Sequence, residues 1–107
     1  MKTLDIGRCG LGGGSIGAAK EAFELSRRYA IERQQFGRPI ADFQAIQFKL
    51  AEMAVKLYTM EQIVYDCAKK VDAGKPATLE SSIVKLYCSE MASQVIDEAI
   101  QIHGGMG

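Results

Sequence analysis

The sequence predicts an all-α fold, an antiparallel up-down bundle of three long helices. The strongest indication is an apolar series from Phe43 to Val71 whose spacing alternates between three and four residues without a break. The flanking segments 15–33 and 78–103 have helical periodicity as well. The connections between them are about ten and six residues long, and connections this short place successive helices antiparallel.

Composition restricts the function classes. The chain has 107 residues, enough for one domain or for part of a larger one. Its thirteen basic and thirteen acidic side chains balance, so no excess of positive charge indicates binding to nucleic acid or to an anionic membrane. No apolar run approaches the ~20 residues that span a membrane as a helix.

Three cysteines, Cys9, Cys67 and Cys88, are an odd number and lie far apart in the sequence. This usage predicts free thiols and a reducing compartment. No pair of them has the spacing of metal ligands, and the single histidine, His103, cannot complete a zinc site with them. We therefore expect no metal site.

Five glycines lie just before or within the start of the first expected helix: Gly10, Gly12, Gly13, Gly14 and Gly17. Those at 12, 14 and 17 satisfy the spacing G-x-G-x-x-G. A dinucleotide-binding fold also needs a strand before that motif and a βαβ unit around it, and neither is indicated here. Small residues instead let a helix lie close against another backbone, a neighbour that we expect this chain to lack.

The first helix is expected over 15–33. One stripe of its surface is apolar or small, which predicts the face that enters the core. This stripe comprises Ile16, Ala19, Phe23, Ser26 and Ala30.

The segment 32–47 joins the first two helices and is rich in polar and aromatic side chains. Gly37 supplies a positive φ just past a helix end and Pro39 cannot continue a helix, so we expect a helix–loop–helix corner. Two arginines, four glutamines and two phenylalanines crowd this corner. Planar hydrogen-bond donors and ring faces together suit a ligand that has phosphates and a flat aromatic base.

The second helix is expected over 42–73, with Asp42 as its N-cap and Gly74 as its stop signal. Its apolar series forms one seam over four heptads, which predicts core packing. The seam consists of Phe43, Ile46, Leu50, Met53, Leu57, Met60, Val64, Cys67 and Val71.

The third helix is expected over 78–103, with Thr78 as its cap. Its apolar residues fall in two neighbouring stripes, which indicates that it is covered on more than one side. The first stripe is Val84, Cys88, Met91, Val95, Ala99 and Ile102, and the second is Leu79, Ile83, Leu86 and Tyr87.

Residue types alone reveal no catalytic constellation. Gly104 and Gly105 follow a helix rather than open one, and the negative end of a helix dipole repels phosphate. A glycine C-cap is the simpler interpretation of these two residues. Asp5 and Arg8 by themselves suggest a surface ion pair, and His103 by itself suggests a capping or packing histidine.

Two motifs and the N-terminal segment resemble the acyl-CoA dehydrogenase family. The corner, with the sequence ERQQFGRPI over 32–40 and FQAIQFKLA over 43–51, resembles one hallmark of that family. The ending AIQIHGGMG over 99–107 resembles another, and LDIGR over 4–8 resembles the start of the family's C-terminal helical domain. The matches occur in the family's order and cover nearly the whole chain.

The resemblance implies that residues 1–107 are three of the four helices of that C-terminal bundle, truncated after the QIHGGMG motif. The family's enzymes are FAD-dependent homodimers or homotetramers that dehydrogenate an acyl-CoA thioester and need an electron acceptor. Their C-terminal bundle serves the flavin of the neighbouring subunit.

The resemblance also implies roles for individual residues. On the family's pattern, Arg33 bonds the FAD pyrophosphate, because a guanidinium fork suits phosphate oxygens. Gln35, Phe36 and Gln44 line the adenosine side, and Asp5 and Arg8 correspond to positions that touch the acyl-CoA. The C-terminal segment approaches the same cofactor through its backbone and the Gln101 amide; it comprises Gln101, Ile102, His103, Gly104 and Gly105.

Two departures from the family's pattern concern catalysis. The usual catalytic base is a glutamate downstream of residue 107, and the alternative position used by some members corresponds to Gly7. The family's N-terminal helical domain and middle β-domain, which hold the flavin ring and the thioester, are also missing. We therefore expect the isolated chain to be inactive and to bind FAD weakly at best.

A stand-alone helical oligomerisation module without a cofactor is the alternative hypothesis. Arg33, Phe36, Gln44 and Gln101 together favour the enzyme, because packing alone does not require that set. We also expect self-association, since a missing fourth helix leaves an apolar face on the third helix. The expected compartment is the bacterial cytoplasm or, in a eukaryote, the mitochondrial matrix.

Overall fold

The computed structural model describes the backbone of residues 2–105 and the side chains of residue 10 and residues 12–104. Among the described residues, none of the helices combines the length and the hydropathy that crossing a lipid bilayer requires. In chain order the elements are α1 (Lys2–Glu32), β1 (Gln34–Gln35), β2 (Arg38–Pro39), the 3-10 helix η1 (Ile40–Asp42), α2 (Gln44–Asp72), α3 (Thr78–Ile83), the π-helix η2 (Val84–Cys88) and α4 (Ser89–Gly105).

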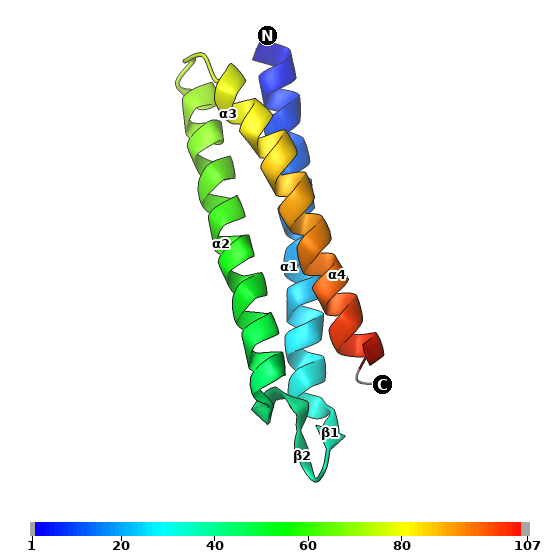
Figure 1. Ribbon diagram of the computed structural model, residues 1–107. Coiled ribbons are helices and arrows are strands. Elements are labelled where there is room, and N and C mark those ends of the chain that lie inside the picture. The colour runs from blue at the N-terminus through cyan, green and yellow to red at the C-terminus, as the bar shows by residue number, and fades with distance from the viewer. Residues whose placement is uncertain (1, 106–107) are drawn as a thin grey trace.

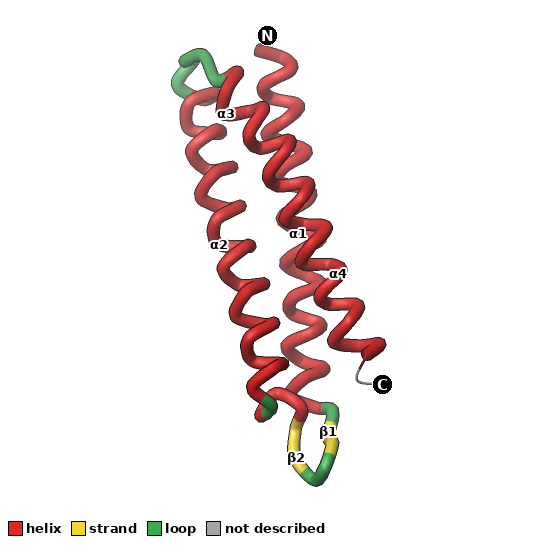
Figure 2. The backbone as a smooth tube through the Cα atoms, viewed as in Figure 1, coloured by secondary structure: helices red, strands yellow, loops and turns green. Residues whose placement is uncertain are grey.

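The fold is a narrow three-rod bundle that measures 56 × 17 × 16 Å, and the expected all-α, up-down arrangement is confirmed (Figure 1). α1 and α2 are the first two rods, and α3, η2 and α4 follow one another in the third. The two-stranded hairpin at the end of α1 lies at the same end of the bundle as the C-terminus of α4 (Figure 2). The N-terminus and α3 lie at the opposite end.

The three helical stripes expected from the sequence form one core. In α2 five of the nine seam residues are buried, and the other four are partly buried and pack against the core. Apolar burial of this kind contributes about 25 cal/mol per Å² removed from water, and all three rods contribute residues to it. The fully buried side chains include Met53, Met60 and Cys67 from α2, Ala19, Ser26 and Ala30 from α1, and Val84, Cys88, Val95 and Ile102 from the third rod.

The first helix begins at Lys2, so the expectation that it begins near residue 15 is wrong. The glycine-rich run lies inside α1, and packing overrides its poor helix propensity. Gly12 is buried, and a Cβ there would collide with the Val84 side chain and come within 3.1 Å of Val64 Cγ2. A close approach therefore occurs at Gly12, but to side chains of this chain's own other rods and not to a backbone that the chain lacks, whereas Gly13 and Gly17 face open space.

The corner between α1 and α2 contains a β-hairpin, which the sequence analysis did not predict. β1 and β2 pair antiparallel, with Gln34 opposite Pro39 and Gln35 opposite Arg38. Gly37 has the expected positive φ, at 80°, but it lies in the hairpin turn and not just past the end of α1. Phe36 and Gly37 both have positive φ. Two such residues in succession form a tight two-residue turn whose twist matches that of the paired strands.

The sequence analysis assigned helix boundaries to three single residues, Asp42, Gly74 and Thr78, and the first and the last of these assignments are wrong. Asp42 lies in η1, and α2 begins after Phe43, which has extended geometry and makes no side-chain cap. Thr78 is the first residue of α3 and follows the N-cap Ala77, again without a side-chain cap. Gly74 does end α2: its φ is 73°, and its N–H donates to the Val71 carbonyl over 3.0 Å.

The third rod was expected as one helix over 78–103 and is interrupted by the π turn of η2. The buried residues of this turn are Val84 and Cys88, at its two ends, so both lie in the core. The helix also continues through Gly105, so Gly104 and Gly105 lie within α4 and are not a C-cap beyond residue 103. The second apolar stripe is largely uncovered in this chain, with Leu79 69% and Leu86 73% exposed.

The expectation of three free thiols is wrong at Cys67, so the inference of a reducing compartment from free thiols loses its basis. Cys67 is disulfide-bonded, whereas Cys88 is free and buried. Burial raises the pKa of the Cys88 thiol, because the low-polarity interior disfavours the thiolate. The side chain of Cys9 lies outside the described residues.

Candidate functional site

The two polar motifs singled out in the sequence lie at one end of the bundle. The corner 33–44 connects α1 to α2 there, and α4 ends toward the same end of the bundle although some sixty residues separate the two motifs (Figure 1). Side-chain contacts join α4 to both other rods at this end. The Tyr29 ring of α1 lies 4.5 Å from the His103 ring, centroid to centroid, and Lys49 of α2 reaches Glu98.

Backbone hydrogen bonds fix the base of the hairpin. The Arg33 N–H donates to the Tyr29 carbonyl over 2.8 Å, which extends the hydrogen-bond pattern of α1. The Arg33 carbonyl accepts from the Ile40 N–H over 2.8 Å, and the Ile40 side chain is fully buried. The hairpin is thus anchored at its base while its tip projects from the bundle.

The hairpin tip presents an aromatic ring to solvent. Phe36 has a φ of 56°, the left-handed region that residues other than glycine rarely adopt, and it is 86% exposed. Its ring meets the Phe43 ring edge-on, with centroids 6.3 Å apart and planes at 74°. The Arg38 guanidinium carbon lies 4.4 Å from the centroid of the same Phe43 ring. Phe43 therefore supports the hairpin tip through its contacts with the Phe36 ring and the Arg38 guanidinium.

The corner also exposes polar side chains. Arg33, Gln35 and Gln44 are all exposed. In the part of the chain that the structure describes, none of the ion pairs involves Arg33 or Arg38. Their charges are therefore available to an anion, and the glutamine amides offer further donors and acceptors.

The last turns of α4 provide a different set of groups. Gln101 and His103 are exposed, whereas the Ile102 side chain is fully buried and can contribute only through its backbone. His103 Nδ1 lies 2.9 Å from the Ala99 carbonyl oxygen. A carbonyl cannot donate, so Nδ1 carries the hydrogen and Nε2 of the neutral ring is left as an acceptor. A Cβ added at Gly104 would meet nothing within 4 Å, so its backbone is open to a close approach.

Lys49 connects this end of α4 to α2. Its Nζ donates to Glu98 Oε2 over 3.1 Å and to Gln101 Oε1 over 3.4 Å. The sequence analysis did not single out Lys49, Glu98 or Tyr29 as site residues. Nothing in the local pattern marks them, because their partners come from other helices.

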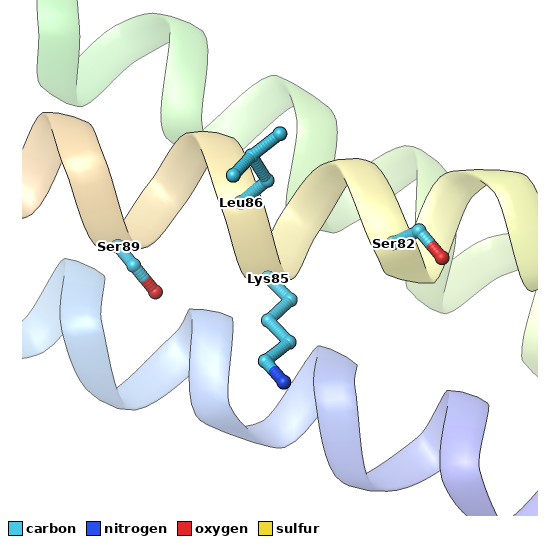
Figure 3. Close-up of a pocket in the computed structure, with 4 residues that line it drawn as sticks. All are labelled: Ser82, Lys85, Leu86 and Ser89. Atoms are coloured by element: carbon cyan, nitrogen blue, oxygen red, sulfur yellow. The ribbon is translucent and has the colours of Figure 1, made fainter.

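Two further expected site residues and one surface depression remain to be placed. The side chains of Asp5 and Arg8 lie outside the described residues. A shallow depression lined by Ser82, Lys85, Leu86 and Ser89 is on the third rod, toward the opposite end of the molecule (Figure 3). Lys85 and Ser89 extend toward α1 and Leu86 points to the other side of the rod, so these groups do not converge on a reacting centre.

Comparison with known proteins agrees with this geometry. The profile of the acyl-CoA dehydrogenase C-terminal domain matches residues 1–107. The chain belongs to the acyl-CoA dehydrogenase family. Its members are flavoprotein oxidoreductases, and the fold described above is their C-terminal helical domain.

Individual relatives are similar over the whole chain. The CarC subunit of the caffeyl-CoA reductase–Etf complex of Acetobacterium woodii is 50% identical over 107 residues, and the 3-(aryl)acrylate reductase of Clostridium sporogenes is 48% identical; the match covers 100% of this chain and 28% of each protein. The butyryl-CoA dehydrogenase structure from Megasphaera elsdenii superimposes with a TM-score of 0.94 at 40% identity, over 97% of this chain and 27% of that one. The chain thus spans about a quarter of the length of these relatives.

Proposed function

We propose that the chain is the cofactor-facing C-terminal domain of an FAD-dependent oxidoreductase that acts on the Cα–Cβ bond of an acyl-CoA thioester. The observation that carries the proposal is the meeting of both motifs at one end of the bundle. Exposed arginines, glutamine amides and the Phe36 ring of the corner lie at that end, and α4 is joined there to α1 through Tyr29–His103 and to α2 through Lys49–Glu98. Packing of three helices does not require this set.

The donor set fits the adenosine-diphosphate half of FAD. In this proposal the exposed Arg33 guanidinium binds the pyrophosphate, where two parallel N–H groups match phosphate oxygens. The Phe36 ring covers one face of the adenine, and Gln35 and Gln44 hydrogen-bond to the adenosine around it. On the family's pattern, we expect the cofactor to be the one carried by a neighbouring subunit.

The end of α4 takes a different part of the cofactor in this proposal. Its last carbonyls have no helical partners, and together with the dipole they favour hydrogen-bond donors over phosphate. We therefore assign ribose or ribityl hydroxyls to the backbone from Ile102 to Gly105 and to His103. Gln101 contributes its amide. The phosphates remain with Arg33 at the positive part of the site.

FAD, when bound, supplies the two-electron chemistry of the reaction. The residues of this chain bind and orient it, and none of them acts as the catalytic base in this proposal. Asp5 and Arg8 remain proposed contacts to the acyl-CoA. Isolated residues 1–107 are accordingly expected to show no acyl-CoA oxidation.

The relatives favour one alternative direction of the same reaction. Two of them, at 50% and 48% identity, are named as reductases, and one belongs to a complex with an Etf. Reduction of an α,β-unsaturated acyl-CoA is therefore the second candidate for the parent protein, with an electron-transferring flavoprotein as the redox partner. Anaerobic assays of the full-length protein with a saturated and an unsaturated thioester distinguish the two directions.

The parent is proposed to be a homodimer or homotetramer. The CarC subunit and the 3-(aryl)acrylate reductase both come from bacteria. This favours the bacterial cytoplasm over the mitochondrial matrix as the compartment of the parent protein. The competing hypothesis, a helical oligomerisation module without a cofactor, predicts that the corner residues have no effect on FAD binding.

The test is a titration of FAD into the apo-form of the full-length protein and of its Arg33→Ala variant. A lost charge-assisted hydrogen bond is worth about 1.5–3 kcal/mol, so we expect FAD affinity to fall by about 10- to 150-fold. Arg28→Ala is the matched control, because Arg28 is an exposed arginine of α1 that lies outside the corner. Equal affinities of wild type and Arg33→Ala would mean that the corner is structural.

A further inference from the structure

Lys49 makes a bridge between two helices that neither motif predicts. It stands in the second turn of α2, and its ammonium group contacts Glu98 and Gln101 of α4 at 3.1 Å and 3.4 Å. The pair is partly shielded from water, with 34% of the Lys49 side chain and 25% of the Glu98 side chain exposed. Partial burial weakens screening by salt, so this ion pair is stronger than a fully exposed one.

The charge of Lys49 offsets an unfavourable field. The C-terminal end of α4 carries the negative end of the helix dipole, and the Glu98 carboxylate adds a full negative charge two turns before that end. Together they oppose the approach of an anionic ligand. Lys49 is the cation in contact with Glu98, and it lies on the side of α4 that faces α2.

The same ammonium group also orients an amide. A lysine ammonium has only donors, so its contact with Gln101 places the amide oxygen toward Lys49. The Nε2 end of Gln101 is then directed away from Lys49, with two N–H donors available. Gln101 is exposed, so these donors are accessible at the end of the bundle where the two motifs meet.

We propose that Lys49 is a positioning residue of the cofactor-binding end: it neutralises Glu98 and holds the Gln101 amide with its donors free for the cofactor. This inference rests on the function proposed above. Lys49 acts through Glu98 and Gln101 and does not itself touch the cofactor. Its loss leaves an uncompensated carboxylate beside the site and an amide free to rotate.

The experiment is a titration of FAD into the apo-form of the full-length protein and of four variants. Lys49→Met is expected to weaken FAD binding by about tenfold, because a charge-assisted contact is lost and Glu98 is left unpaired. Lys49→Arg keeps the charge and its reach, so near wild-type affinity is expected. In Lys49→Met/Glu98→Gln the unpaired carboxylate is also removed, and most of the lost affinity should return.

Lys70→Met is the matched control. Lys70 is also a lysine of α2 that pairs with a carboxylate of the third rod, Glu80, over 3.5 Å. It lies 21 residues from Lys49, about 30 Å along the helix at 1.5 Å per residue, and far from the corner. If Lys70→Met weakens FAD binding as much as Lys49→Met does, the effect is general loosening of the bundle and the inference is overturned.

The remaining outcomes separate this inference from the proposed function. Weaker binding by Arg33→Ala together with unchanged binding by Lys49→Met would overturn the role of Lys49 and leave the proposed function intact. Unchanged binding by both variants would overturn both. Equal losses in Lys49→Met and Lys49→Met/Glu98→Gln would overturn the neutralising role of Lys49.

Discussion

At the scale of single residues, Gly12 is the position where the structure makes the sharpest demand on side-chain size. It is the glycine of the N-terminal run that meets another rod, because a Cβ there would collide with Val84. The equally helical Gly13 has open space beside it. An alanine substitution at each of the two glycines therefore separates the effect of packing from the effect of helix propensity.

Gly12→Ala is expected to destabilise the chain by about 1–3 kcal/mol, the usual cost of overpacking, despite the better helix propensity of alanine. Gly13→Ala is expected to stabilise it by about 0.5–1 kcal/mol, because propensity acts there alone. Thermal unfolding of both variants, followed by circular dichroism at 222 nm, is the measurement. Equal shifts in the same direction would contradict the packing of α1 against η2 at this point.

At the scale of elements, the β1–β2 hairpin combines backbone strain with exposure. Phe36 occupies a position where asparagine or glycine is usual, and its ring is almost fully exposed. A residue in a sparsely populated backbone region costs about 1–3 kcal/mol, and such strain tends to mark functional sites. This agrees with a ring that is held out for a ligand.

Phe36→Asn is expected to raise the midpoint of thermal unfolding and to weaken FAD binding. Relief of about 1 kcal/mol of strain corresponds to a rise of about 4–8 °C in a domain of this size. Loss of one stacking surface lowers FAD affinity in the full-length protein. Calorimetry of residues 1–107 gives the first quantity and FAD titration of the parent gives the second; a variant that is less stable and binds FAD normally would contradict this role of the hairpin.

What the sequence predicts among the elements depends on where the stabilising contacts lie. The heptad seam of α2 specifies a buried helix by itself, since each member repeats the same local pattern. The helical state of the glycine run is accompanied by packing at Gly12, and the hairpin turn places Phe36 in a left-handed conformation that residues other than glycine rarely adopt, so local propensity misjudges both. Asp42 and Thr78 are residue types that commonly cap helices. The N-cap of α2 is instead Phe43, one residue after Asp42, and the N-cap of α3 is Ala77, one residue before Thr78.

Some residues of the candidate site can be identified from a local motif, and others only from the fold. Arg33, Phe36 and Gln44 stand in one continuous motif and could be identified from the sequence. Lys49 and Tyr29 acquire their roles only when α4 is placed beside them, because Glu98 and His103 are more than forty residues away from either. Contacts of this kind leave no signal in the spacing of a single sequence.

At the scale of the whole molecule, the narrow bundle leaves one apolar face of the third rod uncovered. Leu79, Ile83 and Leu86 are 69%, 40% and 73% exposed. An exposed apolar patch of this kind favours association with a partner surface.

Residues 1–107 are therefore expected to form a dimer or a larger assembly at micromolar concentration, through this face. Leu86→Glu should shift the equilibrium toward monomer, because it places a charge in the apolar contact. Leu25→Glu, at a half-exposed leucine of α1, is the control and should leave the assembly unchanged. Sedimentation velocity over a range of concentrations is the measurement, and a monomer at every concentration would refute this prediction.

The central claim is that the corner 33–44 and the end of α4 together form one side of an FAD site. A crystal structure of the full-length parent with FAD tests it most directly. The account predicts an Arg33 guanidinium nitrogen about 2.7–3.2 Å from a pyrophosphate oxygen of the cofactor carried by the neighbouring subunit, with the Phe36 ring against the adenine. FAD bound with its adenosine diphosphate away from both segments, and Arg33 in solvent, would contradict it.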